Sequence, residues 1–305
     1  SMSFNYLGCL YMGEIGMLNI NTNYAASFAS KAASSAQRGL DSAMEKLSSG
    51  SRINYAKDDA AGQAIATRIT AEVQGLKMAS RNASDAQSLI DTADSALGET
   101  TNLLLRMREL AVQSANGTMS GDDRTALNAE FNQLASEITR IDANTSWAGE
   151  TLFNNTSRTF HIGTGNNDAD KISITIGNMD ADFTGSTHII AKIDHDSDDS
   201  NDDVAPEIDT ATKAQLTIAE LDTAIQTVAT QRGNLGAMSN RLSSTISNLD
   251  QIGVNLEASR GRIQDADFAA ETSNLARNQI LQQAATAMLA QANASQGSIL
   301  TLIRN

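Results

Sequence analysis

Residues 79–111 read ASRNASDAQSLIDTADSALGETTNLLLRMRELA, and this stretch decides the fold. Its small and apolar residues recur in alternating steps of four and three, which keeps one stripe of a helix against a partner helix along its whole length. The members of this stripe are Ala79, Ala83, Ala86, Ile90, Ala93, Leu97, Thr100, Leu104, Met107 and Ala111. No proline interrupts residues 60–115, so one helix could reach roughly 80 Å. Asp58 and Asp59 come just before it, where acidic side chains favour the positive end of the helix dipole.

A second helix is expected directly after the first. Asn116-Gly117 breaks the pattern, and Ser120 then stands three residues before Asp123, the spacing of an N-terminal capping pair. The four-three stepping resumes at Leu127, Phe131, Leu134, Ile138 and Ile141. We expect this helix to fold back on the first.

The C-terminal half contains the natural partner for the first stripe. Helical spacing returns near Leu216 and continues through Ile218, Leu221, Ile225, Val228, Leu235, Met238, Leu242, Ile246, Leu249 and Leu256. The sequence therefore predicts a mainly α fold, a long antiparallel helical bundle or coiled coil formed by the N- and C-terminal halves. The residues between the halves must be an excursion from this bundle.

The middle of the chain has a different pattern. Residues 159–162 and 171–176 alternate apolar and polar side chains, as half-buried strands do, and residues 163–170 between them are rich in turn formers. We expect a small β-hairpin there. Residues 194–209 hold seven aspartates and one glutamate, which indicates an exposed acidic loop.

The start of that acidic segment imitates a calcium-binding loop. Asp194, Asp196 and Asp198 have the alternate spacing of such a loop. The sixth and twelfth positions, however, are Asp199 and Ala205, where a calcium loop needs glycine and glutamate. We therefore prefer a solvated loop and expect no metal site.

The two ends of the chain, residues 19–47 and 268–303, are compatible with helices but dominated by Ala, Ser and Gln. Burying such small side chains recovers little free energy against about 1–2 kcal/mol of backbone entropy per residue. We expect these ends to be poorly ordered in a lone molecule and to fold against neighbouring copies; the alternative is an ordinary pair of terminal helices packed on their own domain. The residues expected to mediate self-assembly are Ile20, Phe28, Leu40, Met44, Leu47, Leu275, Ile280, Leu281, Met288, Leu289 and Leu300.

Composition argues against several classes of function. The formal net charge is −14, which disfavours binding to nucleic acid or to an anionic membrane. No run of about 18 apolar residues is present, so we expect no transmembrane helix. Cys9 is the one cysteine, and none of His161, His188 and His195 falls in a zinc-protease motif. We expect no catalytic, cofactor-binding or metal-binding residues and no enzymatic activity.

A family resemblance enters at residues 47–65. Their sequence, LSSGSRINYAKDDAAGQAI, closely resembles the signature that bacterial flagellins carry between their two N-terminal helices. Residues 19–23 resemble the family's N-terminus, residues 106–116 its central helix, and residues 278–284 with 289–293 its C-terminus. The four stretches occur in the family's order. Two features depart from the family: an extension at the N-terminus and a very short variable region.

The resemblance implies a structural subunit of the flagellar filament that serves motility. It implies export through the flagellar type III apparatus, a secreted, extracellular location, and partners that include other flagellin subunits, cap and hook-junction proteins and an export chaperone. Four regions follow: an extension or cloning remnant at 1–17; a terminal helical pair, 18–57 with 262–305, in the inner filament tube; a bundle core, 58–150 with 211–261; and a variable, outward-facing region, 151–210.

One further set of residues carries an expectation from the family. Arg106, Glu109 and Leu110 stand at i, i+3 and i+4 and so share one face of a helix. The resemblance implies that they contact the animal innate immune receptor for flagellin. The alternative is a solvated ion pair beside a core leucine.

Other functions stay open as alternatives. A junction protein between hook and filament would share the terminal helices. A surface adhesin would bind a carbohydrate or host ligand through residues 159–176, and an enzyme would need a catalytic centre in the middle of the chain.

Overall fold

The structure is a computed structural model that describes residues 22–178 and 207–304. Five α-helices account for most of it: α1 Tyr24–Ser49, α2 Ala60–Ser114, α3 Gly121–Asn144, α4 Ala211–Gln264 and α5 Phe268–Arg304. Four short strands and a 3-10 turn lie between α3 and α4: β1 Ser146–Trp147, β2 Glu150–Thr151, β3 Ser157–His161, η1 Asp168–Asp170 and β4 Lys171–Thr175. The chain forms two compact units, a terminal unit within Ser1–Thr67 and Ser259–Asn305 and a central unit, Arg68–Ala258. The predicted fold class is confirmed.

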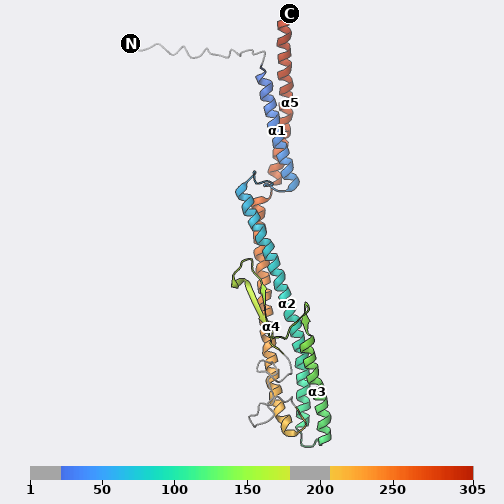
Figure 1. The fold of residues 1–305 in the computed structure, drawn as a ribbon. Helices are drawn as coiled ribbons and strands as arrows, with labels where there is room; N and C mark the ends of the chain where they lie inside the picture. Colours follow the sequence, from blue (N-terminus) through green and yellow to red (C-terminus); the bar gives the residue numbers. More distant parts are fainter. Residues whose placement is uncertain (1–21, 179–206, 305) are drawn as a thin grey trace, which may run out of the picture. The chain divides into compact units, whose positions relative to one another are not determined.

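The central unit is built on the antiparallel pair of α2 and α4, which run side by side in Figure 1. All ten residues of the predicted α2 stripe are buried, and none is more than 3% exposed. On α4 the buried leucine and valine side chains recur every seven residues, at Leu221, Val228, Leu235, Leu242 and Leu249. The repeat in the sequence therefore determined which faces of these helices meet.

Ion pairs between α2 and α4 help to set the register in which the two helices pack. Arg232 lies within the α4 repeat, and its Nε and Nη2 donate to the two carboxylate oxygens of Asp94 on α2 at 2.7 and 3.2 Å. The hydrogen bond to Asp94 raises the pKa of Arg232. Arg108 makes a similar two-pronged contact with Asp222. These pairs are more than one-third exposed, so they contribute to the choice of register more than to stability.

The helix α3 begins at the predicted capping pair. The Asp123 N–H donates to Ser120 Oγ at 3.2 Å, and the Ser120 N–H donates back to Asp123 Oδ2 at 3.0 Å. The Ser120 hydroxyl also donates to Asp123 Oδ2, at 2.6 Å, and this bond, followed by the one from the Ser120 N–H, lowers the pKa of Asp123. Phe131 and Ile138 of α3 are fully buried in the core that α2 and α4 share. The prediction that this helix folds back on α2 is confirmed.

The predicted hairpin is also present, and it begins two residues earlier than expected. Strands β3 and β4 pair antiparallel, with Ser157 opposite Thr175 and His161 opposite Lys171. Ile172 and Ile174 point into the core of the helices. Asn82 of α2 donates from Nδ2 to the His161 carbonyl at 2.8 Å, which fixes the hairpin to the bundle.

A second hairpin was not predicted. Strands β1 and β2 pair around a two-residue turn in which Ala148 and Gly149 have φ of 53° and 87°. Two left-handed residues are typical of a tight hairpin turn. Alanine rarely adopts this conformation, so the sequence carried no recognisable signal for the turn.

The chain re-enters the described structure at residue 207. Ile208 is fully buried, its N–H donates to Asn128 Oδ1 at 2.9 Å, and its carbonyl accepts from Ser114 Oγ. Lys213 pairs with Glu207 at 2.7 Å and with Asp209. Residues 207–209 thus belong to the packed unit, and the prediction that they are part of an exposed acidic loop is wrong. The calcium-like residues 194–199 lie outside the described residues.

Candidate assembly surface

Residues 50–59 connect α1 to α2 within the terminal unit. Gly50 ends α1 in the left-handed conformation, with φ of 70°. The connection is joined to the one between α4 and α5: the Arg52 N–H donates to the Gln264 carbonyl at 2.7 Å, and the Ala266 N–H donates to the Gly50 carbonyl at 2.9 Å. Two connections more than 200 residues apart in sequence are therefore held together by backbone hydrogen bonds.

The rest of the signature stretch, residues 47–65, includes the first turns of α2 and the residues that pack against them. Asp59 Oδ1 accepts from the Gly62 N–H at 2.9 Å and so caps the helix. Ile53 is only 2% exposed. A Cβ on Gly62 would meet the Asp59 carboxylate and would lie 2.8 Å from Ile53 Cδ1. Glycine at this position is therefore required by close packing.

Replacing Gly62 by alanine is expected to destabilise the protein by about 1–3 kcal/mol, because the added methyl group would displace the capping carboxylate and a buried isoleucine. Gly253 of α4 is the matched control, since nothing lies within 4 Å of its Cβ position. Gly253→Ala should raise stability by up to about 1 kcal/mol through helix propensity. Urea unfolding of both variants measures the difference, and equal stabilities would contradict this role for Gly62.

In the terminal unit α1 and α5 run antiparallel and side by side (Figure 1). Among the side chains of α1 and α5 that the structure describes, those buried in this contact are all alanines: Ala29, Ala36 and Ala43 on α1 and Ala285 and Ala292 on α5. Such small side chains remove little apolar area from water, so the contact contributes little free energy.

Polar contacts supplement these five buried alanines, which we call the alanine seam. Asn23 Nδ2 donates to the Ala292 carbonyl at 3.2 Å, and Gln282 donates to Gln37. Lys46 and Glu271 form an ion pair at 3.9 Å. These contacts fix the register of the two helices without adding an apolar core.

The large apolar side chains of the terminal unit are largely exposed. Among the residues predicted to mediate assembly, the most exposed are Phe28 (77%), Ile280 (66%), Met288 (64%), Met44 (54%) and Leu281 (49%). Others lie half-buried beside the alanine seam, namely Leu40, Leu47, Leu275 and Leu289. Ile20 and the side chain of Leu300 lie outside the described residues. We call the exposed residues, together with Tyr24 (70%) and Phe268 (59%), the outer apolar set. Large exposed apolar groups are typical of interaction surfaces.

Tyr24 and Phe268 were not among the predicted assembly residues. For Tyr24 the signal was the repeat of alanine every seven residues on α1, which marks the face toward α5 and leaves this aromatic residue on another face.

The face of α2 around Arg106 is charged. Arg106 pairs with Glu109 at 3.0 Å and donates twice to Glu130 Oε1 of α3, at 3.1 and 2.9 Å. The hydrogen bonds to Glu130 and then those to Glu109 raise the pKa of Arg106. Leu110 is only 1% exposed and belongs to the core. Its inclusion as a receptor contact is therefore corrected: the side chain is out of reach. Glu130, 24 residues away in sequence, joins this face through the fold.

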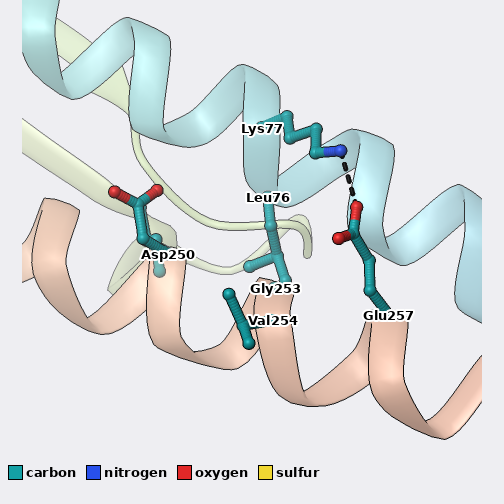
Figure 2. A pocket seen from close by; sticks show the side chains of 7 residues that line it. Leu76, Lys77, Asp250, Gly253, Val254 and Glu257 are labelled. Carbon is teal, nitrogen blue, oxygen red and sulfur yellow. Dashed lines mark hydrogen bonds and ion pairs between the residues drawn. The ribbon is translucent and has the colours of Figure 1, made fainter.

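A pocket of about 200 Å³ opens between α2 and α4 in the central unit. Figure 2 shows its apolar side chains Leu76 and Val254, with the 2.6 Å ion pair of Lys77 and Glu257 at its rim. Its lining contains neither a nucleophile paired with a base nor a metal-ligand cluster. Across residues 22–178 and 207–304 no group of three or more His, Cys, Asp or Glu side chains is placed to hold a metal. In the same residues, no helix is long and apolar enough to span a bilayer.

Comparison with known proteins identifies the family. The bacterial flagellin N-terminal helical region matches residues 20–158, and the bacterial flagellin C-terminal helical region matches residues 218–303. A flagellin of Halalkalibacterium halodurans is 43% identical over 86% of this chain and 91% of its own length. The flagellar filament 33 kDa core protein of Treponema phagedenis is 39% identical over 93% and 99%. A solved structure described as a flagellar hook-associated protein from Vibrio parahaemolyticus covers 68% of this chain and all of its own, with a TM-score of 0.56 and 13% identity, and shares the fold.

The helical architecture and these relatives define a structural protein of the bacterial flagellum, not an enzyme. The chain belongs to the bacterial flagellin family and is a component of the flagellar filament that drives motility.

Proposed function

We propose that this flagellin polymerises by burying its outer apolar set against the terminal units of neighbouring copies. The observation that supports the proposal most is the division of the terminal unit into an alanine seam within the molecule and large apolar residues on its surface. Residues that would normally form a core are left exposed. Copies joined through two different faces form an open helical fibre when the rotation between successive copies does not close a ring.

The energetics of the terminal unit support coupled folding. Helices of 26 and 37 residues obtain most of their stability from packing an apolar face, and here that face is mainly alanine. Contacts with neighbours would bury Phe28, Ile280 and Met288 and supply the missing free energy. A chain whose ends fold late suits export in an unfolded state to the exterior, with an export chaperone, the cap and hook-junction proteins as partners.

Electron microscopy tests the proposal most simply. Purified protein, seeded with sheared filaments or salted out, should form long helical filaments. Binding of a carbohydrate ligand by protein that never polymerises would favour the adhesin alternative instead. Amorphous aggregates as the sole product at every seeding condition would reject assembly through the terminal unit.

We also propose that the animal innate receptor for flagellin recognises the charged face formed by Arg106, Glu109 and Glu130. The three side chains are about half or more exposed and linked by hydrogen bonds across two helices, so they present a fixed charge pattern. Fixed, complementary charges at an interface determine partner choice.

A reporter-cell assay with depolymerised protein tests this recognition. Arg106→Ala should weaken the response at least about tenfold, because the loss of a central arginine contact costs about 1.4 kcal/mol or more. Arg140→Ala is the matched control, since Arg140 pairs with Glu137 in the same exposed i, i+3 manner on α3. An absent response to the unmodified protein at saturating dose, or equal potency of the two variants, would reject the proposed face.

A further inference from the structure

The turn between α2 and α3 contains the sequence Asn116-Gly117. Both residues are exposed, and nothing lies within 4 Å of the Cβ position of Gly117. Asn-Gly occurs at this one place in the chain. The absence of a side chain on the second residue leaves its backbone nitrogen open to close approach.

The hydrogen bonds of the turn hold Asn116 but leave that nitrogen free. The Asn116 carbonyl accepts from the Met119 N–H at 3.2 Å and from Arg124 Nη2 at 2.9 Å. Its side-chain Oδ1 accepts from the Thr118 N–H at 3.3 Å, which polarises the carboxamide carbon. Within the part of the chain that the structure describes, the Gly117 N–H donates to no acceptor. An unengaged nucleophile is thus adjacent in the chain to a polarised electrophile.

We propose that Asn116-Gly117 is a site of spontaneous deamidation, a modification that the turn itself promotes. The Gly117 nitrogen loses its proton and attacks Asn116 Cγ, which closes a five-membered succinimide. The bond from Cγ to the side-chain nitrogen breaks, and ammonia leaves with the proton. Water then opens the ring at either carbonyl, giving aspartate or isoaspartate. No oxidant, reductant or enzyme takes part.

The product changes the end of α2. A new carboxylate appears beside the negative end of the helix dipole, where a negative charge is unfavourable. Isoaspartate also inserts a methylene group into the backbone, which lengthens the turn that the Met119 and Arg124 hydrogen bonds close. Modified subunits would therefore be more acidic and would differ at the junction of α2 and α3.

The chain offers an internal control at Asn144, the last residue of α3. This residue is also exposed, but its Nδ2 donates to the Arg140 carbonyl at 2.9 Å. The following residue is the β-branched Thr145, whose N–H is engaged with the Ile141 carbonyl at 2.9 Å. At Asn144, therefore, both the side-chain amide and the backbone nitrogen that would attack it are already engaged in hydrogen bonds.

The test is peptide mass mapping of the full chain during incubation at neutral and mildly alkaline pH. Asn116 should exchange its amide for a carboxyl at least about tenfold faster than Asn144, and the rate should rise with pH because the attacking nitrogen must lose a proton. Gly117→Ala, which adds one methyl group in open space, should slow the reaction about tenfold with unchanged circular dichroism. Equal rates at Asn116 and Asn144, or an unchanged rate in Gly117→Ala, would overturn the proposal.

Discussion

Removal of residues 268–305 is expected to abolish filament formation and to leave the central unit folded. The deletion takes away α5 and with it four members of the outer apolar set, Phe268, Ile280, Leu281 and Met288. The central core, in contrast, is formed from residues of Arg68–Ala258, including Leu104, Phe131 and Leu242, all fully buried. Its stability should therefore survive the loss of α5.

Two measurements on the truncated chain distinguish these effects. Electron microscopy after seeding should show no filaments, whereas the full chain taken through the same cycle should show them. Circular dichroism should show a cooperative thermal transition that Leu104→Ala lowers in both chains, because that core side chain is worth about 2–5 kcal/mol. Filaments formed by the truncated chain, or a non-cooperative transition, would contradict the division of roles between the two units.

Substitution of two phenylalanines, one at a time, is expected to affect stability in one case and assembly in the other. Phe131 is fully buried in the central unit and Phe28 is 77% exposed in the terminal unit. Phe131→Ala should lower the free energy of unfolding by about 3–5 kcal/mol, since it leaves a cavity in a packed core. Phe28→Ala should change that free energy by no more than about 0.5 kcal/mol.

The effects on polymerisation should be reversed. Phe28→Ala should raise the concentration needed for filament growth about tenfold or more, because an aromatic side chain buried at an interface often contributes about 2 kcal/mol. Phe131→Ala should polymerise normally at temperatures where it stays folded. Urea unfolding and light scattering of the two variants provide the comparison, and normal growth of Phe28→Ala would show that this residue lies outside the contact.

The central unit was predictable because its helices follow one period without interruption. Ten stripe residues of α2, from Ala79 to Ala111, are buried as expected, since the four-three spacing fixes a face whatever the partner is. Leu110 was misjudged because α3 covers α2 from a second side and widens the buried stripe. The link from Arg106 to Glu130 depends on that same packing and has no local signal.

The terminal unit was harder to predict because side-chain size does not decide its packing. From the sequence, Phe28 and Met44 were predicted to mediate assembly, but the face of α1 that meets α5 was not assigned; Ala29, Ala36 and Ala43 form that buried seam. Two helices that approach on small residues leave large ones outside. Large apolar residues gathered on a surface are typical of an interaction site.

Amide hydrogen exchange of α1 and α5, measured on the monomer and on filaments of the same preparation, tests the central claim most directly. Exchange in both helices should be fast in the monomer and at least about a hundredfold slower in the filament, since the neighbours supply the packing that the alanine seam lacks. The central helices should be protected in both states. Slow exchange of α1 and α5 in a monomer that forms no fibres would show that the terminal helices need no neighbours.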